Sequence, residues 1–102
     1  MKKTDQERFD AIWKLAKATA EYEVINRHGF VQEHHNAWGD IYVSLKGDFG
    51  KWLRKETGSN LRKEIKVHIP HSDFNFMFTY ARAFQQVLEE YGIDSRDDIE
   101  FN

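Results

Sequence analysis

The chain has 102 residues, of which 40% are hydrophobic and 31% charged, and its formal net charge is −2. This length fits one ordinary domain, and this composition is typical of a globular chain and not of a disordered one. The absence of cysteine excludes disulfide scaffolds, cysteine-ligated zinc, iron–sulfur clusters and cysteine nucleophiles. A polar N-terminal segment and the lack of any long apolar run indicate neither a signal peptide nor a membrane span. We therefore expect a cytoplasmic protein with no membrane partner.

The first predicted helix covers residues 5–28. Thr4 and Glu7 have the spacing of a capping box, and Gly29 follows as a helix-ending glycine. Apolar residues recur at helical spacing along one side: Phe9, Ile12, Trp13, Ala16, Ala20 and Val24.

The same helix carries a second, weaker apolar stripe, made of Ala11, Leu15, Ala18, Tyr22 and Ile25. A helix that is apolar on two sides is either sandwiched within its own fold or lends one side to a partner. The sequence leaves both alternatives open.

Residues 30–58 give a mixed pattern. The apolar spacing favours a helix over residues 33–46, although residues 41–45 would also suit a short strand. Because glycine is unfavourable inside helices, we expect a break at residues 47–50, and then a short helix from Lys51 to Thr57 that Gly58 ends.

Residues 63–69 alternate between apolar and polar side chains up to Pro70, which predicts a half-buried strand. Such a strand needs a partner, either residues 41–45 or the edge of another chain. A helix is predicted over residues 73–91, capped by Ser72 or Asp73 and ended by Gly92.

The expected architecture is α+β and helix-dominated, with long helices at both ends and a broken helix with one or two short strands between them. The alternative is an all-α fold in which residues 63–69 form an extended connector. We expect one compact domain over residues 1–92 and an acidic C-terminal tail over residues 93–102, from which Ile93, Ile99 and Phe101 could dock back.

Residues 46–68 carry seven Lys or Arg against three acids, interleaved with aromatic residues. Single-stranded nucleic-acid binders use such a pattern, because cations follow phosphates while rings stack on bases. The candidate nucleic-acid residues are Lys46, Lys51, Trp52, Arg54, Lys55, Arg62 and Lys63. Phe49, Trp52 and Leu53 also fit the apolar face of a short helix, which favours a core role for them.

The Gly47-Asp48-Phe49-Gly50 turn, with basic residues behind it, resembles the clamp loop of KH RNA-binding domains, and this resemblance implies contact with an RNA backbone. The acidic Asp48, a short following helix and the lack of a strand before the first helix depart from the KH pattern. We favour an ordinary interhelical turn and assign no family.

His68 and His71 have an H-x-x-H spacing, but it spans a strand end and a proline and not one helix face. Without a cysteine partner or an H-E-x-x-H pattern, no metal or other cofactor is expected. Ser72 lies beside His71 and Asp73 only in sequence, which is no indication of a catalytic triad. We therefore expect a protein that is not an enzyme.

The function that the sequence favours is a small protein-interaction module that regulates or inhibits a larger partner, or that self-assembles into a homo-oligomer. The alternative is the RNA-binding module described above. Since Trp and Tyr dominate interface energetics, the expected partner-binding residues are Trp13, Tyr22, Trp38, Tyr42 and Trp52.

Overall fold

The computed structural model describes residues 2–102. Within these residues, three helices alternate with three strands along the chain: α1 (Lys3–His28), β1 (Ala37–Ser44), α2 (Gly47–Thr57), β2 (Glu64–His68), α3 (Phe74–Glu90) and β3 (Ser95–Phe101). The strands form one antiparallel sheet in the order β2-β1-β3, so β1 is central. The expected helix-rich α+β class is confirmed, and the all-α alternative is wrong.

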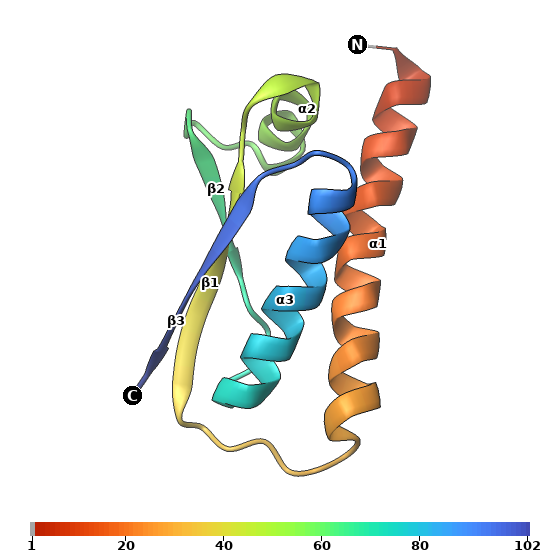
Figure 1. Ribbon diagram of the computed structural model, residues 1–102. Coiled ribbons are helices and arrows are strands. Elements are labelled where there is room, and N and C mark those ends of the chain that lie inside the picture. Colours follow the sequence, from red (N-terminus) through yellow and green to blue (C-terminus); the bar gives the residue numbers. More distant parts are fainter. Residues whose placement is uncertain (1) are drawn as a thin grey trace.

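The two long helices form successive layers on one side of the sheet. Figure 1 shows α3 between the sheet and α1, and α3 contacts β1, β3 and α1. Side chains from every layer meet in one buried cluster, whose largest fully buried members are Phe84, Ile41, Leu53, Ile69, Met77 and Leu88.

Both long helices lie where their sequence periodicity predicts. The α1 helix ends at His28 before Gly29, and Asp73 caps α3 by accepting hydrogen bonds from the backbone N–H groups of Asn75 and Phe76. The predicted capping box is wrong: α1 begins at Lys3, its N-cap is Lys2, and no side chain caps it. Thr4 therefore lies inside the first turn.

The helix expected over residues 33–46 is wrong, because this segment contains the central strand β1. Ala37, Ile41 and Val43 alternate into the core, while Trp38 on the opposite face is exposed. Position 39 of this strand has room only for glycine. A Cβ atom built there would lie 2.5 Å from the carbonyl oxygen of Asp98 on β3.

The break expected at residues 47–50 is also wrong, because α2 begins at Gly47 and runs through Gly50. A Cβ atom at Gly50 would lie 2.0 Å from the backbone carbonyl of Leu45. The glycine therefore lets α2 fold back directly onto the end of β1, and its packing role outweighs its low helix propensity.

The strand predicted over residues 63–69 is present as β2, and its partner is β1, with Val43 opposite Ile65 and Ile41 opposite Val67. Where an acidic tail is expected, the structure instead has β3, which pairs with β1 from Ser95 to Phe101. The Phe101 ring stacks on Phe74 with a centroid separation of 4.3 Å. The acidic side chains of this segment therefore belong to an edge strand, where charge discourages further strand pairing.

Candidate functional site

The outward side of α1 presents a row of apolar side chains to solvent. Its members are those of the second sequence stripe: Ala11, Leu15, Ala18, Tyr22 and Ile25, all of them exposed. The exposed fractions of Leu15, Tyr22 and Ile25 are 44%, 64% and 51%. We call these five residues the α1 seam. Their spacing, alternately four and three residues, keeps them on one line along a helix.

The side of α1 opposite the seam is the one that enters the core, through Phe9, Ile12, Ala16, Ala20 and Val24. At 100° per residue, the two rows lie about 160° apart around the helix. Since α3 and the sheet lie on the core side, no element of the described chain packs over the seam.

A groove between α1 and α3 borders the seam. Its volume is about 700 Å³, and Leu15, Phe78 and Val87 supply its apolar lining. Charged residues form its rim, where the Arg82 guanidinium lies 5.4 Å from the centroid of the Phe78 ring. Leu15 belongs to both the seam and the groove, so the two features form one continuous surface on the two helices.

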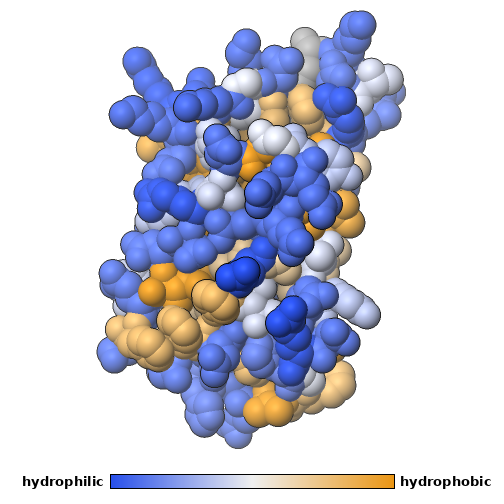
Figure 2. All heavy atoms as spheres, in the orientation of Figure 1, coloured by the Kyte–Doolittle hydropathy of each residue, from blue (hydrophilic) through white to orange (hydrophobic). Residues whose placement is uncertain are grey.

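The space-filling view shows how apolar side chains are distributed on one face of the molecule. Figure 2 shows apolar atoms reaching the surface in separate patches between hydrophilic side chains. Exposed apolar residues gathered in rows are typical of interaction sites, whereas single ones are ordinary on any protein surface.

The five predicted partner-binding residues fall in three different places. Trp52 is only 5% exposed and packs against Phe9 and Phe49. Trp13 is partly buried, and its ring contacts Phe84 edge to face and Phe49 in a tilted arrangement. Both rings therefore complete the core between α1, α2 and α3, and only Tyr22 of the five lies on the α1 seam.

Trp38 and Tyr42 lie on the outer face of the sheet, away from the helices. Trp38 is 50% exposed, while the Tyr42 ring is covered by the Arg96 guanidinium, 4.1 Å from its centroid. Between them, the largely buried Asp40 carboxylate forms an ion pair with Lys66, whose Nζ lies 3.8 Å away, and Nδ1 of His68 lies 3.4 Å from the same carboxylate. The charges of Asp40 and Lys66 on this face are therefore already paired with each other.

In the basic segment of residues 46–68, the cationic side chains are at the surface but the Phe and Trp rings are not. Lys46, Lys51, Lys55, Arg62 and Lys63 are exposed, and Arg54 donates from Nη2 to the carbonyl oxygen of Arg62 at 3.2 Å. Phe49 and Trp52, the Phe and Trp rings of this segment, are both buried. The segment therefore offers phosphate-binding charge without an exposed indole or phenyl ring for base stacking.

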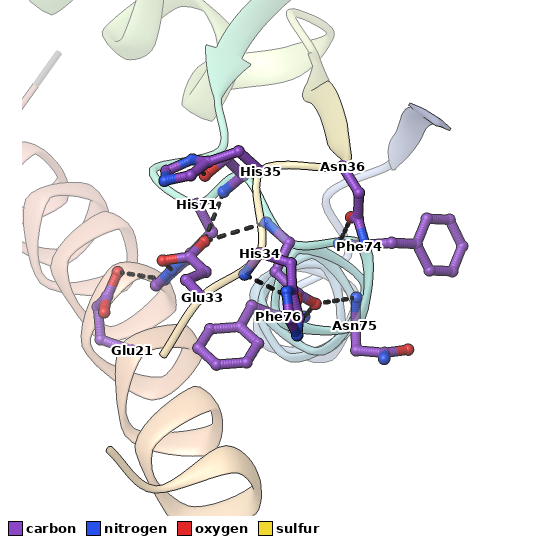
Figure 3. A network of polar contacts seen from close by, with 11 residues as sticks. Glu21, Glu33, His34, His35, Asn36, His71, Phe74, Asn75 and Phe76 are labelled. Carbon is purple, nitrogen blue, oxygen red and sulfur yellow. Dashed lines mark hydrogen bonds and ion pairs between the residues drawn. The ribbon is translucent and has the colours of Figure 1, made fainter. Parts of the chain in front are cut away.

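A polar network joins the loop after α1 to the start of α3, as Figure 3 shows. Glu33 Oε1 accepts hydrogen bonds from the backbone N–H groups of Ser72 and Asp73. In return, Asp73 Oδ2 accepts the backbone N–H of His34 at 3.2 Å. Asn36 Oδ1 accepts the backbone N–H of Phe74 at 2.9 Å. The loop side chains thus satisfy donors that the end of a helix leaves free.

These contacts set the ionisation of both carboxylates. Burial raises the pKa of Glu33, but the N–H groups of Ser72 and Asp73 and the neighbouring His71 outweigh it, so the pKa lies below the ordinary 4.5. Burial also raises the pKa of Asp73, and the N–H groups of His34, Asn75 and Phe76 outweigh it, so its pKa lies below 3.8. Both groups are therefore held in the charged form.

His71 lies between two acidic side chains within this network. Its Nδ1 is 3.3 Å from Glu33 Oε2, and its Nε2 is 3.4 Å from Glu21 Oε1. Its ring packs against Phe76 and Tyr80. Burial, with the negative charge of Glu21, raises the pKa of Tyr80 to about 12. His71 thereby ties α1, the loop and α3 together.

Ser72 is paired with a histidine, but not with its neighbour in sequence. Its Oγ lies 2.7 Å from Nδ1 of His35 in the opposite loop. A hydrolytic serine also needs backbone N–H groups free to stabilise an oxyanion. Here the N–H groups of Ser72, Asp73 and Asn75 already donate to carboxylates. The geometry therefore favours a role in holding the two loops together.

Within residues 2–102, no three His, Asp or Glu side chains are grouped so that they could hold a metal ion. Among the helices of the same residues, none is both long enough and apolar enough to traverse a bilayer. No family model, curated protein or solved structure matches this chain.

Proposed function

We propose that this protein is a small non-catalytic interaction module that docks a protein partner on the α1 seam. The observation that carries the proposal is the exposure of Leu15, Tyr22 and Ile25 in one row on the outside of a long helix. A row of this kind exposes apolar surface to water, and a bound partner would bury that surface.

The layout of the helices supports the same surface. The seam lies on a regular helix anchored through its opposite side, so it is presented without reorganisation of the backbone. The adjoining groove adds the Phe78 ring and a charged rim. An apolar centre with a polar border is the usual composition of a protein interface.

The test is site-specific photo-crosslinking in the cells that produce the protein. A benzophenone amino acid replaces Tyr22 in one variant and Leu61, an apolar residue of similar exposure between α2 and β2, in the control. We expect a covalent protein adduct from position 22 and none from position 61. No adduct at position 22, or equal adducts at both positions, would contradict the proposal.

No specific observation favours the nucleic-acid alternative over this one, because the segment of residues 46–68 buries its Phe and Trp rings. The proposal therefore stays with the helical surface.

A further inference from the structure

We propose that the partner on the α1 seam is the α1 seam of a second copy of this chain, packed antiparallel across a twofold axis. The inference rests on the proposed function, because it names the occupant of that same surface. Two independent features of α1 support it: the order of large and small residues along the seam, and the charges beside it.

Residue size alternates over the first four residues of the seam, before Ile25. Ala11, Leu15, Ala18 and Tyr22 follow one another as small, large, small and large. In an antiparallel pair, Ala11 of one chain can lie opposite Tyr22 of the other while Leu15 lies opposite Ala18. Leu15 and Tyr22 then each meet an alanine, which is the arrangement that fills space between close helices. A parallel pair would place large on large and Ala on Ala, leaving gaps at the Ala layers.

The charges beside the seam select the same register. Lys14 and Glu21 lie on one flank of the seam, with 75% and 47% of their side chains exposed. In the antiparallel register, Lys14 of each chain faces Glu21 of the other, so the pair forms twice. In a parallel pair, each of these residues would face an uncharged position, Thr19 or Asn26. Opposite charges of this kind select orientation more than they add affinity.

Both charged residues already have partners within the chain. Lys14 Nζ lies 2.8 Å from Asp10 Oδ2, and this contact raises the pKa of Lys14. Glu21 Oε1 lies 3.4 Å from Nε2 of His71. These contacts hold Lys14 charged and Glu21 in place beside the seam.

The overall shape permits this pairing. Because the core side of α1 lies about 160° from the seam, the body of each copy lies on the far side of its own helix. Two copies joined through their seams would therefore place α3 and the sheet of each chain away from the contact, back to back, as the position of α1 at the outside of the molecule indicates (Figure 1).

The first test is sedimentation velocity over a concentration series from about 1 µM to 1 mM, the range in which an interface at the small end of the usual sizes assembles. We expect a monomer–dimer equilibrium. Tyr22→Glu should weaken dimerisation at least about tenfold, whereas Leu61→Glu, the matched control, should leave it unchanged. Circular dichroism should show both variants folded, since both positions are exposed. A monomer at every concentration, or equal weakening by both variants, would overturn the inference.

The second test fixes the orientation. The chain has no cysteine, so only introduced thiols can react. Ala11→Cys and Tyr22→Cys are oxidised separately and then as a mixture, with one variant carrying a mass tag. In the antiparallel register, a cysteine at position 11 of one chain lies opposite a cysteine at position 22 of the other. Two cysteines at the same position in the two chains are instead separated by eleven residues, about 16 Å along the helix. A disulfide spans less than about 7 Å between Cα atoms.

We therefore expect a disulfide only in the mixture. Disulfides within each separate variant would indicate a parallel pair and overturn the register. The mass of the photo-adduct at position 22 separates this inference from the proposed function. An adduct of twice the chain mass supports both. An adduct of another mass, with a monomeric protein in solution, supports the interaction module and overturns self-association.

Discussion

Glu33, in the loop after α1, accepts the backbone N–H of Ser72, which lies 39 residues further along the chain. The same oxygen accepts the N–H of Asp73, the residue that caps α3. One carboxylate therefore attaches the α1–β1 loop to the start of the helix that forms the middle layer of the fold.

This attachment predicts a loss of stability in acid. The pKa values of Glu33 and Asp73 are below their ordinary values in the folded state, so the unfolded chain binds protons more readily. The stabilisation is complete above the ordinary values of 4.5 and 3.8, and it decreases as the pH falls through them towards the folded values. Urea unfolding between pH 7 and pH 3 measures this decrease.

Glu33→Gln is the matching variant. The amide still accepts hydrogen bonds but carries no charge, so the free energy of unfolding at pH 7 should fall by about 1 kcal/mol. Its dependence on pH below 5 should also be shallower than that of the unmodified chain. Glu56→Gln, on the exposed surface of α2, is the control. Identical pH profiles for Glu33→Gln and the unmodified chain would show that the network does not stabilise the fold.

Tyr80 should titrate well above the ordinary tyrosine pKa of 10.0. Its pKa is raised to about 12, by burial and by Glu21. In an ultraviolet titration of phenolate absorbance, Tyr80→Phe should remove a component that rises near pH 12. Since the folded pKa is above the ordinary 10.0, the contribution of Tyr80 to stability is complete below pH 10 and decreases as the pH rises towards 12. Identical titration curves for Tyr80→Phe and the unmodified protein would contradict this assignment.

Gly50→Ala should destabilise the fold by about 3 kcal/mol, near the upper end of ordinary overpacking. The added methyl group would meet the backbone carbonyl of Leu45, which cannot move without disturbing the end of β1. In an isolated helix the same change would be stabilising by about 1 kcal/mol, so the sign of the effect distinguishes packing from propensity. Lys51→Ala, at the exposed neighbouring position, serves as the control in thermal unfolding. A rise in stability for Gly50→Ala would contradict the close approach to Leu45.

Trp52 and Trp38 should differ sharply in their effect on stability. Trp52→Ala should cost about 3–5 kcal/mol, because it removes a large ring from the core. Trp38→Ala, at a half-exposed position on the outer face of the sheet, should cost about 1 kcal/mol or less. Urea unfolding followed by circular dichroism measures both. Equal losses for the two variants would contradict the burial of Trp52 or the exposure of Trp38.

The sequence by itself determined the elements whose signal is local. The apolar period of α1 and α3, Gly29 after α1, the Asp73 cap and the alternation in β2 all depend on neighbouring residues along the chain. The second stripe of α1 was also visible in sequence, because a row of residues on a helix follows from spacing alone.

The tertiary structure alone decided what each surface meets. A strand at β1 depends on β2 and β3, which are distant in sequence, and Gly39 and Gly50 are explained only by backbone that approaches them from Asp98 and Leu45. Burial of Trp52 and exposure of Tyr22 likewise depend on which helices pack together, since both are large aromatic residues on predicted helices. Local pattern specifies the faces of an element, but only the packing of distant segments determines which face remains in water.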